Sequence, residues 1–478
     1  MAKPLLPAPY VVFKDGQLPK GPLPSGIFVF IGYGEASVGS VSTAAEGVLT
    51  PIANPNDIRS KFGTGPLARY LTSAFLGGLG FAYGIRLPST TAGTIGTPTI
   101  GGFTAGALAG TVQNAYDVRV RVALAGALGV AQVEYSLDGG RTWGASQVLK
   151  SGANSVIGPN GFDSGLTFST TATNLTTASL QFSCSTVAPL PSDAAIKSTM
   201  DTCIQDASLF FNGFVVCRET GDKALLTTLI TDIDSKLTAA ETDWFKYLYA
   251  IVPGTVVATP ALTLADVQHL RANAVSRRVQ IGGMPAIIKS LGGQFIMSIA
   301  PLMAARRAAL DPQNDLGMVR AGPLSAIVGF APGWTDGDVT AIDLIKNTVT
   351  IRRHVGAGGF YFTNDWMSDP TSDYSKSCRR LVADLIASDI RVAGVPFLKM
   401  DVDPLDPASS GEVLLNACRG PLDSRKRSKQ ISAYTISIPE GQDILTDEEL
   451  VVEVGVVPMG TASWIRFNLG FKSPFAGG

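Results

Sequence analysis

The chain is poor in charged side chains. Charged residues make up 16% of its 478 residues, against ~25% in an average domain, and the formal net charge is −1. Such a chain has few charges with which to cover an isolated surface, so we expect part of its surface to lie against other subunits. The balanced charge also argues against a nucleic-acid-binding protein, which needs a basic surface.

Long apolar runs and paired cysteines are missing as well. No run reaches the ~18 uninterrupted apolar residues of a transmembrane helix. The first residues are too rich in proline, and their apolar run is too short, for a signal peptide. We therefore expect assembly in a cytoplasm without membrane insertion. The five cysteines form no C-x-x-C pair, which predicts buried free thiols; a disulfide formed between subunits in an oxidising medium is the alternative. They are Cys184, Cys203, Cys217, Cys378 and Cys418.

Signatures of catalysis are also lacking. The chain has no G-x-x-x-x-G-K loop, no G-x-S-x-G turn and no zinc-type spacing of ligands. Of its two histidines, His269 is expected to be structural within a helix, and His354 follows two arginines that oppose its protonation. Asp401 and Asp403 fit loop capping better than a pair of catalytic carboxylates. We therefore expect no enzyme, no cofactor and no metal.

One glycine pattern invites a cofactor reading. Gly32 and Gly34 follow an apolar strand, as in a dinucleotide-binding loop. The next glycine, Gly39, stands five positions after Gly34 where that motif needs three, and no helix obviously opens there. An ordinary turn is the better interpretation.

Composition divides the chain into segments. The first is a proline-rich arm in which Tyr10, Val11, Val12 and Phe13 can form a short strand. From residue 89 the chain is rich in Thr, Gly, Ser and Ala, and short alternating runs predict strands. Helical and apolar runs on both sides predict an α/β core that a β-sandwich interrupts. The expected segments are an extended N-terminal arm at 1–25, the first part of the core at 26–88, the inserted β-sandwich at 89–186, the α/β core at 187–334, a C-terminal core domain at 335–460 and a linking strand at 461–478.

Apolar periodicity places individual elements in the core. Ser192 before Asp193 predicts a helix N-cap, and a stripe of leucines and isoleucines predicts a helix over 221–240. Alternating helices and strands predict strands in parallel. Buried strands are expected at 27–31, 209–216 and 244–252, and further helices at 285–291, 295–310, 375–390 and 411–418.

The insertion contains one specific motif. Ser136, Asp138, Gly140, Thr142 and Trp143 match the Asp-box pattern Ser-x-Asp-x-Gly-x-Thr-Trp. The aspartate can bond the backbone of its own turn, the glycines supply unusual dihedrals, and the tryptophan packs beneath. Sialidases carry several such boxes, but here there is one, so we interpret it as a structural hairpin. A role facing carbohydrate is the alternative.

The C-terminal end is rich in β-forming residues. Alternating or β-branched runs predict strands at 431–438 and 450–457. The last run, 464–471, places Ile465, Phe467, Leu469 and Phe471 on one face. A strand this apolar needs a sheet edge, either in its own chain or in a neighbouring subunit.

Taken together, the chain resembles the tail sheath proteins of contractile phage tails and related injection machines. The resemblance rests on the extended arm, on the strand 27–31 that leads into Gly32, Tyr33 and Gly34, on the β-rich insertion and on the terminal strands. It also rests on Ile351, Arg352 and Arg353 followed by the run 360–364 and a helix. Residues 335–471 match best, in architecture rather than in any one motif.

The resemblance implies a mixed-sheet fold and a structural role. Subunits would stack as rings around a tail tube, exchange strands through both terminal arms, and contract to drive the tube through the host envelope. The implied partners are other copies of the chain, the tail tube protein, and the baseplate and tail terminator proteins, in a phage virion. The insertion would lie outside. Basic residues of one helix and of one run are candidates for contacts with an acidic tube: Arg379, Arg380, Arg425, Lys426, Arg427 and Lys429.

Two other functions remain open from the sequence. The chain could be another virion component, a baseplate or tail-tube protein, which would form discs or small rings. It could also be a carbohydrate-binding adhesive protein built on the Asp-box module, in which case residues 89–186 alone would bind glycans.

Overall fold

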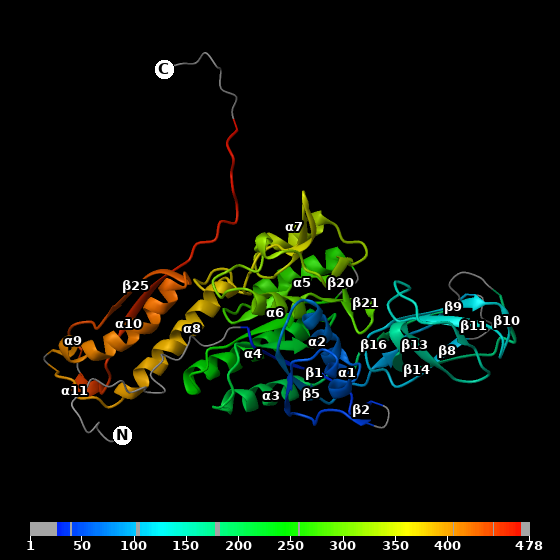
Figure 1. Ribbon diagram of the computed structural model, residues 1–478, viewed down its shortest axis with the longest axis horizontal. Coiled ribbons are helices and arrows are strands. Elements are labelled where there is room, and N and C mark those ends of the chain that lie inside the picture. Colours follow the sequence, from blue (N-terminus) through cyan, green and yellow to red (C-terminus); the bar gives the residue numbers. More distant parts are fainter. Residues whose placement is uncertain are drawn as a thin grey trace, which may run out of the picture.

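The computed structural model describes residues 26–38, 41–101, 106–176, 182–256, 259–404, 406–442 and 444–469. Tyr10, Val11, Val12 and Phe13 of the expected arm strand lie outside these ranges, as does Phe471. The described part is elongated, with the insertion at one end and a helical C-terminal unit at the other (Figure 1).

The core is a six-stranded sheet with the order β19-β18-β17-β1-β5-β4. Neighbouring strands run parallel, except that β4 is antiparallel to β5. The central strands are buried along their whole length, as parallel strands covered on both faces are. The strands are β1 (Phe28–Tyr33), β4 (Leu49–Ile52), β5 (Ala82–Leu87), β17 (Gly213–Cys217), β18 (Tyr249–Pro253) and β19 (Val279–Gly282), with the small pair β2 (Ser37–Val38) and β3 (Val41–Ser42) beside them.

Helices cover both faces of this sheet. One face packs on α1 (Asp57–Phe62), α2 (Pro66–Leu76) and α6 (Ala300–Ala309), and the other on α3 (Asp193–Gln205) and α4 (Lys223–Asp243). Helix α5 (Pro260–Asn273) contributes to both cores. The parallel strands and the α/β alternation predicted from the sequence are therefore found.

Local signals explain where two of these helices lie. The hydroxyl of Ser192 accepts a hydrogen bond from the backbone N–H of Ala195, as expected of an N-cap. On α4, Leu226, Leu229, Ile230, Ile233 and Leu237 are buried against the sheet in the predicted stripe. Leu225, which the stripe included, is exposed instead.

The sequence prediction was wrong at 285–298 and right for most of the helix expected at 295–310. In place of the first helix and the start of the second, the chain forms a hairpin of β20 (Pro285–Ser290) and β21 (Gly293–Ser298), and α6 begins only at Ala300. Leu291 and Gly292 at the turn both have positive φ, as the primed hairpin turns require. A short apolar run does not distinguish strand from helix by period, and the glycines were the better signal. Strand β22 (Ile327–Phe330) completes this three-stranded sheet.

Strand and helix bounds differ from the prediction elsewhere by a few residues. Strand β17 begins four residues later than expected, at Gly213, and β18 begins at Tyr249 because α4 continues to Asp243. Helix α7 (Asp336–Asp343) starts from a capping box formed by Thr335 and Asp338. The hairpin β23 (Ile351–His354) and β24 (Ala357–Phe362) follows.

The insertion is an all-β unit with its own hydrophobic core. One sheet has the order β12-β11-β9-β16-β6 with β7 pairing β16, a second has the order β13-β14-β8, and β10 pairs β15. Its β-rich character was predicted; that its sheets form a sandwich remains our interpretation. The strands are β6 (Thr94–Ile95), β7 (Thr99–Ile100), β8 (Gly106–Gly110), β9 (Asp117–Leu124), β10 (Gly126–Ala127), β11 (Gln132–Ser136), β12 (Gln147–Val148), β13 (Asn154–Gly158), β14 (Phe162–Thr170), β15 (Asn174–Leu175) and β16 (Phe182–Val187).

The C-terminal unit consists of α8 (Ser377–Gly394), α9 (Pro407–Ser410), α10 (Glu412–Arg427), α11 (Ile444–Asp447), β25 (Ile431–Ser437) and β26 (Glu453–Pro458). Helix α8 belongs to two cores. Leu381 and Leu385 pack in the main core, whereas Val382 and Ile386 pack with Leu422 of α10 in a separate C-terminal cluster. Because one helix serves both cores, the C-terminal unit is firmly attached to the rest of the chain.

Helix α10 is longer than the sequence indicated. It was expected at 411–418 but continues through Pro421 to Arg427. The basic run before the terminal strands therefore begins in the last turn of α10, where cations favour the negative end of the helix dipole.

A buried ion pair joins the start of α8 to the core. Arg307 of α6 and Asp365 are both 1% exposed or less, and Nη2 of Arg307 lies 3.1 Å from Oδ2 of Asp365. Asp365 also accepts hydrogen bonds from Nε2 of Gln280 at 3.0 Å, from the hydroxyl of Ser377 and from the backbone N–H of Cys378 at 2.9 Å. The carboxylate thus caps α8 while it is neutralised from the opposite side.

We expect Arg307→Met to destabilise the fold strongly. The substitution leaves the Asp365 carboxylate buried without its cation, which costs about 3–5 kcal/mol of unfolding free energy. Urea unfolding followed by circular dichroism measures this loss. The matched control is Arg353→Met, which breaks the exposed pair of Arg353 with Asp336 and should cost about 0–1 kcal/mol. Equal losses of unfolding free energy in the two variants would contradict the conclusion that the buried pair of Arg307 with Asp365 stabilises the fold.

Candidate inter-subunit site

Strands β25 and β26 form an isolated two-stranded ribbon. Tyr434 and Ile436 of β25, with Val454 and Val456 of β26, pack on the cluster around Leu422 of α10. The alternate residues on the other face are exposed. The period of two in the sequence thus matches a ribbon with one face on a helix and the other in solvent.

The two outer edges of this ribbon are unpaired by any strand of the described residues. The two edges of the core sheet, by contrast, are protected. Strand β4 carries an exposed proline, Pro51, and β19 is bridged by Val349. A two-stranded ribbon is marginal in water, and unpaired edges are templates for a further strand. The ribbon is therefore a candidate for strand addition.

The terminal segment 459–469 forms no helix or strand. Its apolar side chains Trp464, Ile465, Phe467 and Leu469 are 88%, 72%, 87% and 93% exposed. The segment extends away from the ribbon instead of folding back onto it (Figure 1). Of the two alternatives that the sequence left open, pairing within the chain is not found in residues 464–469.

The basic residues proposed for tube contact fall into two groups. Arg379, Lys426, Arg427 and Lys429 are exposed. Arg380 is buried and pairs with Asp384 one turn later, and Arg425 is buried with its Nε 2.8 Å from Oδ2 of Asp389. These last two were wrong as contact residues, because their charges hold α8 together and join α10 to it. An aspartate four residues after Arg380 was the overlooked signal.

The Asp box has the expected internal geometry. Oδ1 of Asp138 accepts the backbone N–H groups of Arg141 and Thr142 at 3.0 and 2.9 Å, and the N–H of Gly140 donates to the hydroxyl of Ser136 at 2.8 Å. Gly139 and Gly140 both have positive φ. The indole of Trp143 donates to the carbonyl of Gly140 at 3.1 Å. The motif is thus a hairpin turn, as interpreted.

The insertion offers little to a sugar ring in its described part. The guanidinium of Arg121 covers the Trp143 ring at 4.1 Å. The large apolar side chains exposed on the described insertion are aliphatic, and none is aromatic: Ile100, Leu124, Val130, Val148 and Val187. The adhesive alternative gains no support from these residues.

The remaining residues singled out in the sequence lie in ordinary structural settings. His269 bonds with Asn273 one turn along α5. Burial, and then the nearby charge of Arg352, lowers the pKa of His354. Gly34 is followed by the small pair β2–β3 and not by a helix. All five cysteines are buried and unpaired, and burial raises the pKa of Cys203 to about 11.

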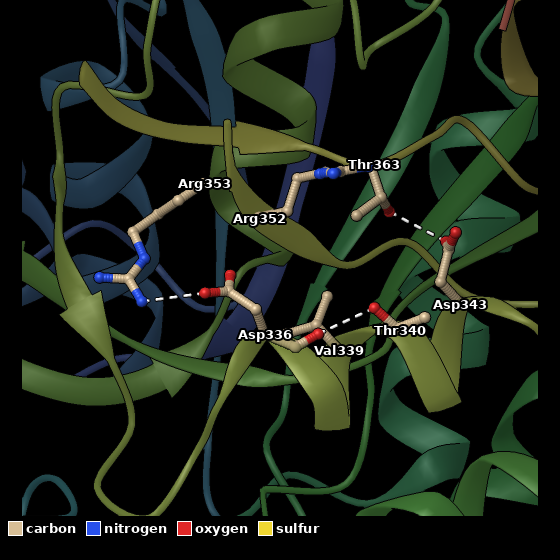
Figure 2. Close-up of a pocket in the computed structure, with 7 residues that line it drawn as sticks. All are labelled: Asp336, Val339, Thr340, Asp343, Arg352, Arg353 and Thr363. Carbon is tan, nitrogen blue, oxygen red and sulfur yellow. Dashed lines mark hydrogen bonds and ion pairs between the residues drawn. The ribbon is translucent and has the colours of Figure 1, made fainter. Parts of the chain in front are cut away.

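A small pocket lies between α7 and the β23–β24 hairpin (Figure 2). Its volume is about 120 Å³, well below the ~300–1,000 Å³ of ligand sites. Three of its four charged side chains have partners: Arg353 lies 2.9 Å from Asp336, and the Thr363 hydroxyl bonds Asp343 at 3.0 Å. Burial raises the pKa of Asp343. The pocket thus lacks the room of a ligand site.

Neither a metal-ligand cluster nor a membrane-spanning helix is found among the described residues. Over the described ranges, no three His, Cys, Asp or Glu side chains gather as metal ligands. No helix there has the length and hydropathy to cross a membrane.

Two family models match nearly the whole chain. DUF2586, N-terminal domain, covers residues 8–365, and DUF2586, C-terminal domain, covers residues 373–476. The chain belongs to the DUF2586 family. The junction of the two models follows Asp365 and precedes α8, so the hydrogen bonds that Asp365 accepts from Ser377 and Cys378 join the two family domains. Among curated proteins none matches the chain.

Solved structures share the fold of this DUF2586 chain. One is the sheath complex of PVC, an extracellular contractile injection system, in the contracted state, with 12% identity, 99% of each chain covered and a TM-score of 0.55. Another is the helical sheath of the anti-feeding prophage in the contracted state, with 12% identity, 98% and 99% covered and a TM-score of 0.55. The sheath tail protein Lin1278 from Listeria innocua has 12% identity, 91% and 95% covered and a TM-score of 0.47. The resemblance to contractile sheath proteins is confirmed at the level of the fold.

The ribbon of this DUF2586 chain should depend on the helix beneath it. Leu422→Ala removes a fully buried side chain from the cluster under β25 and β26, which costs about 2–5 kcal/mol. We expect faster hydrogen exchange in both strands, measured by mass spectrometry, with β17 and β18 unchanged. Val413→Ala, an exposed site on the same helix, is the control and should leave the ribbon protected. Hydrogen exchange in β25 and β26 that is as slow in Leu422→Ala as in the wild type would show that the ribbon does not depend on this helix.

Proposed function

We propose that the chain is the sheath subunit of a contractile phage tail or a related injection machine. It would polymerise around an inner tube and contract to drive that tube through the host envelope. The observation that carries the proposal is the full-length likeness in fold to two contracted sheath subunits, over 98–99% of this chain. The open ribbon and the unpaired apolar terminus support it independently.

Strand exchange would link the subunits. The terminal segment of one subunit would add to an open edge of the β25–β26 ribbon of the next, with main-chain hydrogen bonds holding the link. Ile465, Phe467 and Leu469 would then leave solvent, each side chain contributing about 1.5–3 kcal/mol on full burial. We expect the arm strand of Tyr10, Val11, Val12 and Phe13 and the terminal residue Phe471 to take part in the same mesh.

The ends of the molecule would then face opposite ways. The insertion and the C-terminal unit lie at opposite ends of the long axis (Figure 1). With the insertion outside, the C-terminal unit points toward the tube. The exposed cations Arg379, Lys426, Arg427 and Lys429 are our candidates for contacts with an acidic tube surface. Baseplate and tail terminator proteins would be the other partners, in a virion assembled in a host cytoplasm.

Contraction would move each subunit as a rigid body. Helix α8 is shared by two cores and is tied to α6 by the buried pair of Arg307 with Asp365, so bending there is costly. The strand links have no such packing, since the segment 459–469 makes no strand in its own chain. The links would serve as hinges between rigid subunits while the extended sheath relaxes to a contracted state of lower free energy.

Deleting residues 464–478 should leave a folded subunit that does not polymerise. The described part of this stretch is exposed, so the loss of residues 464–469 takes nothing from the core. Circular dichroism and thermal melting should match those of the full chain, while negative-stain microscopy shows monomers where the full chain forms long hollow tubes. An unfolded product would contradict the proposal, and discs from the full chain would favour a baseplate role.

A point variant makes the same test without shortening the chain. Phe467→Ser removes one apolar anchor and should weaken assembly at least tenfold, measured by sedimentation over a concentration series. Asn468→Ser changes the neighbouring residue on the opposite face of the strand and should assemble normally. Equal assembly of the two variants would argue against a strand that buries one face.

Reversing two exposed charges should separate tube binding from self-assembly. Lys426→Glu with Arg427→Glu places negative charge on the last turn of α10 without touching a core. We expect tubes of sheath alone to form as before, whereas binding to the purified tube protein weakens and loses its salt dependence. The control is the pair Lys150→Glu with Arg320→Glu, two exposed cations outside α10. Tube binding that is unaffected by the α10 variant would remove these residues as contacts.

A further inference from the structure

The base of the insertion receives an element of the core. The β20–β21 hairpin reaches out of the core so that Phe295 is buried among the insertion's own apolar residues, and Leu291 at its turn packs against the same cluster. On the insertion side Tyr116 lies 6.3 Å from Phe295, ring centroid to ring centroid. Two units that are separate in the sequence therefore share one packed joint.

The Asp box contributes a hydrogen bond to this joint. Oδ1 of Asp138 holds the box's own turn, as described above. Oδ2 accepts the hydroxyl of Thr142 at 2.5 Å and also the backbone N–H of Gln294, on β21 of the core, at 2.9 Å. Asp138 is buried, and a buried carboxylate needs such donors, which bind it more strongly than they would a neutral oxygen. One side chain thus fixes both the shape of the turn and its attachment to the core.

Arg69 of α2 forms a second tie beside the first. It is buried, its guanidinium lies 4.2 Å from the centroid of the Phe295 ring and 5.5 Å from that of Tyr116, and its Nη2 donates to the carbonyl of Ala115 at 2.8 Å. Close by, Nδ2 of Asn114 donates to the carbonyl of Thr64 at 2.7 Å. The cation thus contacts a core ring and an insertion ring at the same time.

The two chain connections at the base are also paired. Thr91, on the way into the insertion, forms an antiparallel bridge with Leu190, on the way out. Their backbone groups exchange hydrogen bonds, from Thr91 to Leu190 at 3.2 Å and from Leu190 to Thr91 at 3.0 Å. The connections are thus held to each other where a flexible linker would leave them free.

We infer that Asp138 is a positioning residue that locks the insertion to the core, so that the two units turn as one body. In the sequence the motif looked like an isolated hairpin. In the structure its Asp138 carboxylate bonds the N–H of Gln294 and so attaches the hairpin to the core. An insertion coupled in this way follows every rotation of the core and does not move independently of it. This inference does not depend on the proposed function.

The wild-type chain gives the first test. Spin labels at Ser155→Cys in the insertion and Ser235→Cys on α4 span the joint, and both sites are exposed. The five natural cysteines are buried, so labelling should favour the introduced pair. Full-length labelled chain, diluted into unlabelled chain to suppress signals between subunits, should give one narrow distance distribution by pulsed electron resonance. A broad distribution would overturn the inference outright.

Asp138→Asn then tests the latch itself. The amide oxygen is best kept toward the N–H groups of Arg141 and Thr142, which directs the NH₂ group at the N–H of Gln294 and removes that bond. We expect the Gln294 amide to exchange about tenfold faster and the distance distribution to broaden, with the melting of the insertion little changed. Thr142→Val is the control, because it removes a bond within the box and leaves Gln294 paired.

Both outcomes of the variant are informative. An Asp138→Asn chain with wild-type exchange at Gln294 and a narrow distribution would refute the latch. Should this variant fail to fold, Arg69→Met weakens the same joint from the core side, and the two measurements are read in the same way. Broadening in Thr142→Val as large as in Asp138→Asn would mean that the box acts through its own fold alone.

Discussion

A β-strand edge carries a row of backbone donors and acceptors that must be either paired or solvated. The sheets of this chain differ in how their edges meet this requirement. The core sheet ends in a strand with an exposed proline on one side and is bridged on the other. The β20–β21 hairpin has the Asp box against it. Within the described residues, the ribbon of β25 and β26 has neither protection. Native proteins rarely leave such edges without a device against pairing, so the unprotected ribbon supports the proposal that another strand adds there.

The insertion lies against the carboxyl ends of the core strands. In doubly wound sheets, ligands bind beyond these ends. Here the insertion starts directly after β5. Tyr33, at the end of β1, bonds Gln113 of the insertion at 2.5 Å, and Glu35 bonds the backbone of Thr64 at 2.8 Å. Side chains of the chain itself thus lie at the edge where such sheets bind ligands.

The sequence predicted best where a single local signal was strong. The N-cap at Ser192, the stripe of α4 and the Asp-box turn each depend on residues a few positions apart, and each is found. The hairpin at 285–298 was missed because its apolar run fits both periods, and Leu291 at a positive φ carries no propensity signal. The burial of Arg425 depends on Asp389 of another helix, a contact that no local pattern reveals. The latch of Asp138 to Gln294 joins residues 156 positions apart and was invisible for the same reason.

Helix α8 can also be considered as a lever. It has 18 residues, which at ~1.5 Å per residue makes it about 27 Å long. Asp365 caps its first turn. Helix α10, which carries the ribbon, packs on its later turns. A rotation of the core by about ten degrees would therefore carry the far end of this helix through ~5 Å, which is about the spacing between neighbouring strands in a sheet. A small rotation of the core thus becomes, at the far end of α8, a displacement about as large as the spacing between two neighbouring strands.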